Sequence, residues 1–172
     1  MIEIKSVGFF KKIFSYLPII LLFTSVLNEF DFNYLEMKFF SFNFTYILIF
    51  YYSVKKSDSL GYGSIFIAGL FNDVVVGTPI GISSLLYLLI CSFAAYLRNI
   101  TLRPSLIKDW IFFFITILIA NSIYFILLSI IFNYELDYQN QLFNTFFTFL
   151  LYFFFSYLFN FFENTIMGNN NA

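Results

Sequence analysis

Two stretches of the chain, Trp110–Phe132 and Leu142–Phe162, run for the length of a bilayer without a charged residue. A helix needs about 20 mostly apolar residues to cross the hydrocarbon layer, where its backbone polar groups must be satisfied inside the protein. The whole chain is 60% hydrophobic and only 11% charged. An ordinary soluble domain has about 25% charged residues. These features predict an all-α membrane protein.

Four further apolar stretches precede these two, and each is shorter or carries a polar residue. We therefore predict a compact six-helix transmembrane bundle, a single domain over residues 1–165, with a disordered tail at 166–172. The first stretch follows Lys11 and Lys12 without a small-residue cleavage site after it, so we expect a retained helix and not a signal peptide. The expected spans are about 13–29, 39–54, 60–77, 79–97, 110–132 and 142–162.

The positions of the basic residues test this count independently. With six spans and a cytoplasmic N-terminus, Lys38 alone falls on the outer side. This bias matches the positive-inside rule and predicts that both termini are cytoplasmic. The basic residues on the cytoplasmic side are Lys5, Lys11, Lys12, Lys55, Lys56, Arg98, Arg103 and Lys108.

Composition also limits the chemistry that the chain can carry out. It has no His and a single Cys, Cys91, which excludes His-based acid–base or zinc chemistry and any intrachain disulfide. We find no nucleophile–base pair, phosphate-binding loop or metal-ligand cluster, so we expect neither an enzyme nor a cofactor. The net charge of −1 gives no reason to expect nucleic acid as a partner.

Polar and small residues concentrate towards the end of the third predicted span. Asp73 lies between long apolar runs, and a carboxylate at membrane depth costs about 2.5–3.5 kcal/mol on insertion scales, so it usually faces protein. Helical spacing predicts one small and polar side of this helix, with Ile65, Phe66, Leu70 and Phe71 elsewhere. The residues expected on that side are Gly61, Ala68, Gly69, Asn72 and Asp73.

A turn follows directly. Gly77-Thr78-Pro79 is expected to break the helix, with Pro79 in the first turn of the next one. Gly81 and Ser83-Ser84 are expected to keep that next helix slim near the hairpin. Two hypotheses stay open for this hairpin. Either it forms a protein–protein or ligand site at the outer end, or Asp73 only caps and pins the turn.

Other polar and aromatic positions favour structural roles. Interhelical hydrogen bonds account for the polar residues of the last two spans. Cys91 is expected in small-residue packing, and Tyr51, Tyr52 and Trp110 at the inner membrane interface. The basic loop with Arg98 and Arg103 fits lipid headgroups, with a cytoplasmic partner as the other possibility. The polar residues of the last two spans, for which interhelical hydrogen bonds are expected, are Asn121, Ser122, Asn144, Thr145 and Thr148.

The segment from Gly69 to Gly81 resembles the rod shape-determining protein MreD family of bacterial inner-membrane proteins. That family typically shows a Gly, an Asp four residues later, a Gly four residues beyond, and then a turn like small-Pro-x-Gly. The corresponding residues here are Gly69, Asp73, Gly77 and Thr78-Pro79-Ile80-Gly81. Residues 51–56, followed by Gly61, also look like the family's aromatic helix end, basic turn and glycine.

The resemblance implies a non-enzymatic part of the elongation complex, or elongasome, that supports cell shape and lateral peptidoglycan synthesis. Its implied partners are an MreC-like protein, MreB and the wall-synthesis transglycosylase and transpeptidase. The implied fold is similar to the substrate-binding subunits of energy-coupling factor transporters. Asp73 and its glycines are then expected to shape the surface or pocket that receives a partner's transmembrane helix.

The residues are also compatible with two other classes of function. One is the substrate-binding subunit of a vitamin or precursor transporter, which predicts a polar, aromatic-lined cavity open to the outside. The other is a scaffold for an unrelated complex.

Overall fold

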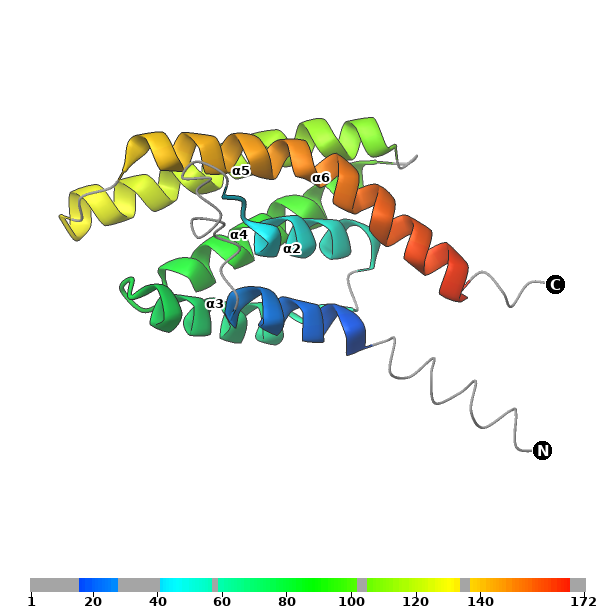
Figure 1. The fold of residues 1–172 in the computed structure, drawn as a ribbon, viewed down its shortest axis with the longest axis horizontal. Helices are drawn as coiled ribbons and strands as arrows, with labels where there is room; N and C mark the ends of the chain where they lie inside the picture. Colours follow the sequence, from blue (N-terminus) through cyan, green and yellow to red (C-terminus); the bar gives the residue numbers. More distant parts are fainter. Residues whose placement is uncertain (1–15, 28–40, 57–58, 102–104, 134–136, 168–172) are drawn as a thin grey trace.

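A computed structural model describes residues 16–27, 41–56, 59–101, 105–133 and 137–167, with side chains up to residue 162. Within these ranges the chain forms six helices, which confirms the all-helical prediction (Figure 1). A helix at Tyr16–Leu27 comes first, and α5 continues directly into a π-helical turn. The remaining elements are α2 (Phe44–Lys55), α3 (Tyr62–Val76), α4 (Ile82–Ile100), α5 (Leu106–Ile126), η2 (Leu127–Ile131) and α6 (Tyr138–Met167).

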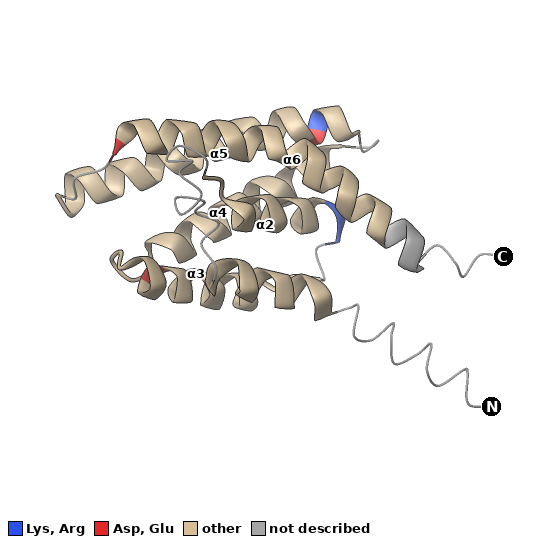
Figure 2. Ribbon diagram, viewed as in Figure 1, with Lys and Arg blue, Asp and Glu red and all other residues tan. Residues whose placement is uncertain are grey.

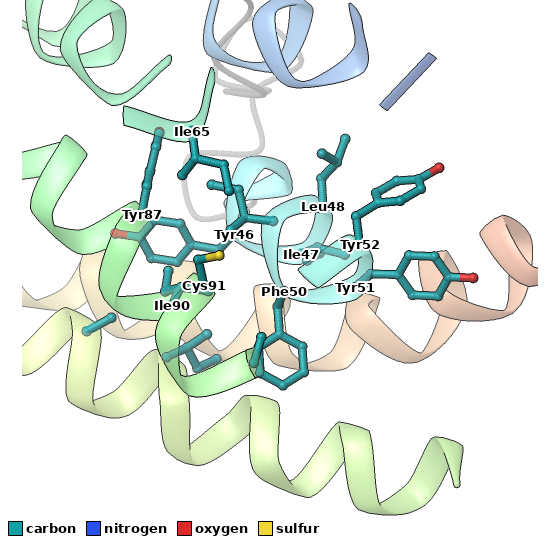
Figure 3. Packing of buried hydrophobic residues seen from close by; sticks show 14 of the residues in the cluster. Tyr46, Ile47, Leu48, Phe50, Tyr51, Tyr52, Ile65, Tyr87, Ile90 and Cys91 are labelled. Atoms are coloured by element: carbon teal, nitrogen blue, oxygen red, sulfur yellow. The ribbon is translucent and has the colours of Figure 1, made fainter. Parts of the chain in front are cut away.

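Helix α2 forms the centre of the bundle. Asn43 caps its start, since Asn43 Oδ1 accepts a hydrogen bond of 3.1 Å from the Tyr46 backbone N–H. Every residue from Thr45 to Val54 is buried, as expected for a helix that is apolar on all sides. Figure 3 shows side chains projecting from α2 in several directions, towards Ile65 of α3 and Tyr87 of α4 among others.

The burial of α2 corrects one expectation from the sequence. Tyr51 and Tyr52 were expected at the membrane interface, but both lie in the core, 1% and 4% exposed (Figure 3). The ring of Tyr51 packs against Phe159 of α6 at a centroid distance of 5.1 Å. Neighbouring helices surround the end of α2. The aromatic residues there therefore pack against protein, and burial along the helix ends only at Lys55 and Lys56.

Helices α5 and α6 run side by side along one side of the bundle, and the Tyr16–Leu27 helix lies beside α3 on the other (Figure 1). Aromatic rings connect α5 and α6 to the central helix α2. The ring of Phe113 on α5 stacks on Tyr152 of α6 at 4.3 Å, and Phe50 of α2 contacts both. Such pairs add about 0.5–1.5 kcal/mol each beyond their buried area.

Three of the described helices are long and apolar enough to cross a membrane: Ile82–Ile100, Leu106–Ile131 and Tyr138–Phe162. Two more, Tyr16–Leu27 and Tyr62–Val76, are apolar but shorter. Many large apolar side chains are exposed on the outside of the bundle, as a lipid-facing surface requires. Charged positions of the described chain lie near helix ends, which leaves the middle of the bundle uncharged (Figure 2).

Candidate functional site

Asp73 joins the end of α3 to the start of α4. Its backbone carbonyl accepts hydrogen bonds from the N–H groups of Gly77 (2.9 Å) and Thr78 (3.0 Å), which closes α3. Its carboxylate accepts three more: Oδ2 from the Gly81 N–H (2.6 Å), and Oδ1 from the Ser83 N–H (2.9 Å) and the Thr78 hydroxyl (3.0 Å). One residue therefore ends one helix with its backbone and begins the next with its side chain.

These contacts explain how a fully buried carboxylate is stable without a cation. Asp73 is 0% exposed, and the described residues provide no ion pair to it. Gly81 is the residue before α4, and Ser83 lies in its first turn, where backbone N–H groups have no partner within the helix. A negative charge at a helix N-terminus also interacts favourably with the helix dipole. The geometry is that of a helix cap donated by the preceding helix.

Gly69 lets the backbones of α3 and α4 meet just below this cap. A Cβ atom added at Gly69 would overlap the backbone N and Cα of Ser84, so only glycine fits without a shift of α4. Ser84 uses the close approach to donate from its hydroxyl to the Phe66 carbonyl at 2.9 Å. Asn72 Nδ2 donates to the Ser83 hydroxyl at 3.0 Å. These contacts close the hairpin along its length.

The turn itself differs in detail from the expectation. Helix α4 begins at Ile82, so Pro79 lies in the turn and not in the first turn of the helix. Gly81 is the N-cap of α4 with φ +104°, and Gly77 is the C-cap of α3 with φ +77°. Both are left-handed conformations that disfavour other residues. Gly81 is therefore needed for backbone geometry, and the prediction that it thins the helix was wrong.

The expected contact face of α3 also needs correction at its first turn. Ala68, Gly69 and Asp73 are buried and Asn72 is half-buried, but Gly61 is exposed and precedes the helix as its N-cap. Ile65, expected elsewhere, is fully buried on this face. Gly69 lies where the backbone of α4 comes closest, and Ile65 is buried one turn earlier in α3.

The polar side chains predicted on α5 and α6 make one hydrogen bond to each other and two to the segment before α2. Asn121 Nδ2 donates to the Thr145 hydroxyl at 2.7 Å. The Thr148 hydroxyl accepts from the Asn43 N–H at 2.8 Å, and Asn144 Nδ2 donates to the Ser41 hydroxyl at 3.1 Å. Ser122 departs from the expectation, because it is exposed and donates to the Leu118 carbonyl of its own helix.

The remaining predicted positions lie at the other end of the bundle. The Arg98 guanidinium donates to the Ser53 carbonyl at 3.1 Å and so holds α4 against the end of α2. Cys91 is buried and accepts a 3.2 Å hydrogen bond from the Ser53 hydroxyl. The Trp110 indole N–H donates to the Phe149 carbonyl at 2.9 Å. Arg103 and Lys38 lie outside the described residues.

The bundle contains a second buried carboxylate, Asp109, which the sequence did not predict. Asp109, in the first turn of α5, is 1% exposed, and its Oδ2 lies 3.2 Å from Lys55 Nζ at the end of α2. Tyr152 of α6 lies close enough to interact electrostatically with Asp109. Asp109 stands between Lys108 and Trp110 at the start of an apolar run, so its sequence position indicated a solvated loop. No local signal links it to Lys55.

The hairpin is suited to positioning helices and not to proton transfer, since donors from Thr78, Gly81 and Ser83 already occupy the Asp73 oxygens. Within the described ranges, no group of three His, Cys, Asp or Glu side chains could hold a metal ion.

Comparison with known proteins gives one match. The family model described as rod shape-determining protein MreD matches residues 10–162, nearly the whole chain and including the α3–α4 hairpin. No curated protein and no solved structure shows significant similarity to the chain. The chain belongs to the MreD family of bacterial membrane proteins that determine cell shape.

Proposed function

We propose that this protein is a non-enzymatic, integral component of the rod elongation complex and supports lateral peptidoglycan synthesis through contacts between transmembrane helices. The observation that carries the proposal is the family match over residues 10–162. The proposed partners are an MreC-like protein and the wall-synthesis transglycosylase and transpeptidase. A bundle whose described loops are this short offers partners mainly the outer faces of its helices and their ends.

We further propose six spans in one domain, a fold similar to energy-coupling factor substrate-binding subunits, and both termini in the cytoplasm of an inner-membrane protein. The charge bias of the sequence supports this topology. The Tyr16 end of the first helix and the Met167 end of α6 also point to the same side of the bundle (Figure 1). Helix α2 has 12 residues and rises only about 18 Å, so its flanks must complete that crossing.

The hairpin's part in this function is to hold the outer face of α3 in position for a partner's transmembrane helix. Asp73 and Gly69 are occupied within the protein, so their effect on a partner is indirect. The face that they position carries exposed apolar side chains, among them Phe66 (44% exposed) and Val74 (68% exposed). Such residues can contact either lipid or another helix.

Two substitutions of the same residue type test this face. Phe66→Ala is expected to lower co-purification of the partner while the membrane level stays normal. The matched control is Phe146→Ala on α6, where the ring is 56% exposed. The reverse pattern would place the partner on α6. Asp73→Ala is expected to lower both membrane level and co-purification, and no change in either would remove the role given to the hairpin.

Depletion followed by microscopy tests the shape function directly. In a strain without a second copy of the gene, we expect rods to lose their width control and become round. Normal morphology after complete loss of the protein would overturn the proposal.

A further inference from the structure

A cavity of about 300 Å³ lies in the bundle beside the α3–α4 hairpin. Asn72 and Ser83 of the hairpin line it, together with Thr45 of α2, Asn121 of α5 and Gln141 of α6. The cavity is partly open, and its size is at the lower end of the roughly 300–1,000 Å³ found for small-molecule sites. Packing alone does not account for a space of this size in an interior that is otherwise close-packed.

The described lining is polar but uncharged. Its polar side chains are amides and hydroxyls, and no described lining residue is Asp, Glu, Lys or Arg. Asp73 is nearby in the sequence, but its carboxylate oxygens are directed to Gly81, Ser83 and Thr78. An ionic ligand would enter without a compensating charge, which is unfavourable away from water. The described part of the cavity wall therefore suits an uncharged ligand.

Hydrogen bonds within the wall determine what the ligand must offer. Asn72, Asn121 and Asn144 each donate from Nδ2 to another side chain, at 3.0, 2.7 and 3.1 Å. These bonds orient the three amides: the carbonyl oxygens of Asn72 and Asn121 can accept, that of Asn144 already accepts from the Thr148 hydroxyl at 3.4 Å, and the second N–H of each amide can donate. A ligand that complements them must bring both donors and acceptors, as a molecule with many hydroxyl groups does.

Aromatic rings supply the other half of a carbohydrate-like environment. Tyr46 and Tyr87 both line the cavity and meet edge to face, with ring centroids 5.9 Å apart (Figure 3). Both rings are largely buried, at 6% and 1% exposed, so each offers the cavity a small apolar edge next to a hydroxyl that can donate or accept. That combination matches a sugar ring, which has apolar C–H faces and polar edges.

We propose that this cavity binds a small, uncharged, hydroxyl-rich molecule of monosaccharide size, either as a free sugar or as the headgroup of a neutral glycolipid. The proposal goes beyond the role in cell shape and does not depend on it, because it rests on the cavity alone. Binding requires no transport step, so it is also separate from a transporter function.

Thermal unfolding of the full-length protein in lipid nanodiscs tests the proposal. Glucose and N-acetylglucosamine represent the free sugar, and monoglucosyl diacylglycerol in the nanodisc represents the lipid-attached form. We expect a saturable rise in Tm with at least one form, because a ligand that binds only the folded protein stabilises it. The charged analogues glucosamine and glucuronate are expected to give no rise. No saturable response in either arm, or an equal response to the charged analogues, would overturn the proposal.

Two neighbouring valines provide a matched pair of variants. Val76 lines the cavity and is 41% exposed, whereas Val75 does not line it and is 46% exposed. Val76→Phe is expected to raise the Kd about tenfold or more by filling the space, while Val75→Phe leaves it within about twofold. Equal effects of the two variants would show that the sugar acts elsewhere on the protein or on the lipid, and would also overturn the proposal.

A polar substitution gives an independent measure. Gln141 lines the cavity, and its side chain makes no hydrogen bond to the described residues; only its backbone carbonyl accepts one, from the Thr145 hydroxyl. Gln141→Leu should therefore weaken binding without unfolding the protein. Gln139→Leu, at an exposed position on the same helix, is the control. Unchanged binding by Gln141→Leu together with unchanged binding by Val76→Phe would exclude this cavity as the site.

Discussion

Asp73, near the end of α3, and Asp109, in the first turn of α5, are both buried, and the protein accommodates them differently. The end of α3 and the start of α5 lie at opposite ends of the bundle (Figure 1). Asp73 is held by N–H and O–H donors from residues five to ten positions ahead of it in the chain. Asp109 is paired with Lys55, which belongs to a helix far away in the sequence. The first arrangement is local and neutral in its donors, and the second is long-range and ionic.

The difference has a consequence for how each end tolerates change. The Asp73 cap depends on two backbone N–H groups, of Gly81 and Ser83, and on one side-chain donor, the Thr78 hydroxyl, so the carboxylate and that hydroxyl are its replaceable parts. The Asp109 pair has two replaceable partners, and removing one of them leaves the other charge in the bundle. Breaking a buried pair from one side is usually worse than removing both partners.

The largest effect is expected from the helix contact under the Asp73 cap. Gly69→Val should prevent α3 and α4 from approaching, because even a Cβ atom overlaps the backbone of Ser84. We expect a loss beyond about 3 kcal/mol, the upper range for overpacking, and little folded protein in the membrane. Gly63→Ala is the control, since a Cβ there has open space. Fluorescence-detected size exclusion measures both, and a folded Gly69→Val would show that the hairpin is looser than described.

The next largest loss of stability is expected at the Lys55–Asp109 ion pair. Lys55→Met should destabilise by about 3 kcal/mol, because Asp109 is left 2% exposed in its side chain without its cation. Asp109→Asn should cost less, since Lys55 is 26% exposed in its side chain and can turn towards lipid headgroups. The double variant is expected to recover much of the loss. Unfolding in a denaturing detergent series measures the cycle, and strict additivity would mean that the pair is not coupled.

Asp73→Ala should destabilise by about 2 kcal/mol, because the N–H groups of Gly81 and Ser83 lose their acceptor. Asp73→Asn keeps one acceptor oxygen and should lie between wild type and Ala. The same detergent series applies. A loss with Asn as large as with Ala would show that charge, and not hydrogen bonding, is what the start of α4 requires.

The smallest effect is expected where neither a charge nor a close backbone contact is involved. Asn121→Leu should cost about 0.6 kcal/mol, typical of an interhelical hydrogen bond in a membrane protein. Thr145→Val should cost somewhat more, because its hydroxyl also donates to the Gln141 carbonyl at 2.8 Å. The double variant should cost no more than Thr145→Val, since one bond joins the two side chains. A loss as large as that of Asp73→Ala would place the Asn121 bond among the main determinants of the fold.

Several of these features could be read from residue order. The apolar runs predicted helices because the bilayer imposes a length and a composition that few other structures satisfy. The spacing from Gly69 through Asp73 to Gly77 predicted a tight hairpin, and the family resemblance drawn from it agrees with the match over residues 10–162. All of this information lies within a few turns of one helix or one bend.

The amino-acid sequence could not indicate which residues contact each other across helices. Nothing near Lys55 in the sequence points to Asp109, and nothing around Tyr51 distinguishes a core ring from an interfacial one. The register of one helix against another decides such contacts, and register depends on the packing of all six helices together. The same holds for the cavity beside the hairpin, whose amide and hydroxyl groups come from several separate helices. Hydropathy and turn chemistry are local properties, whereas burial is a property of the assembled bundle.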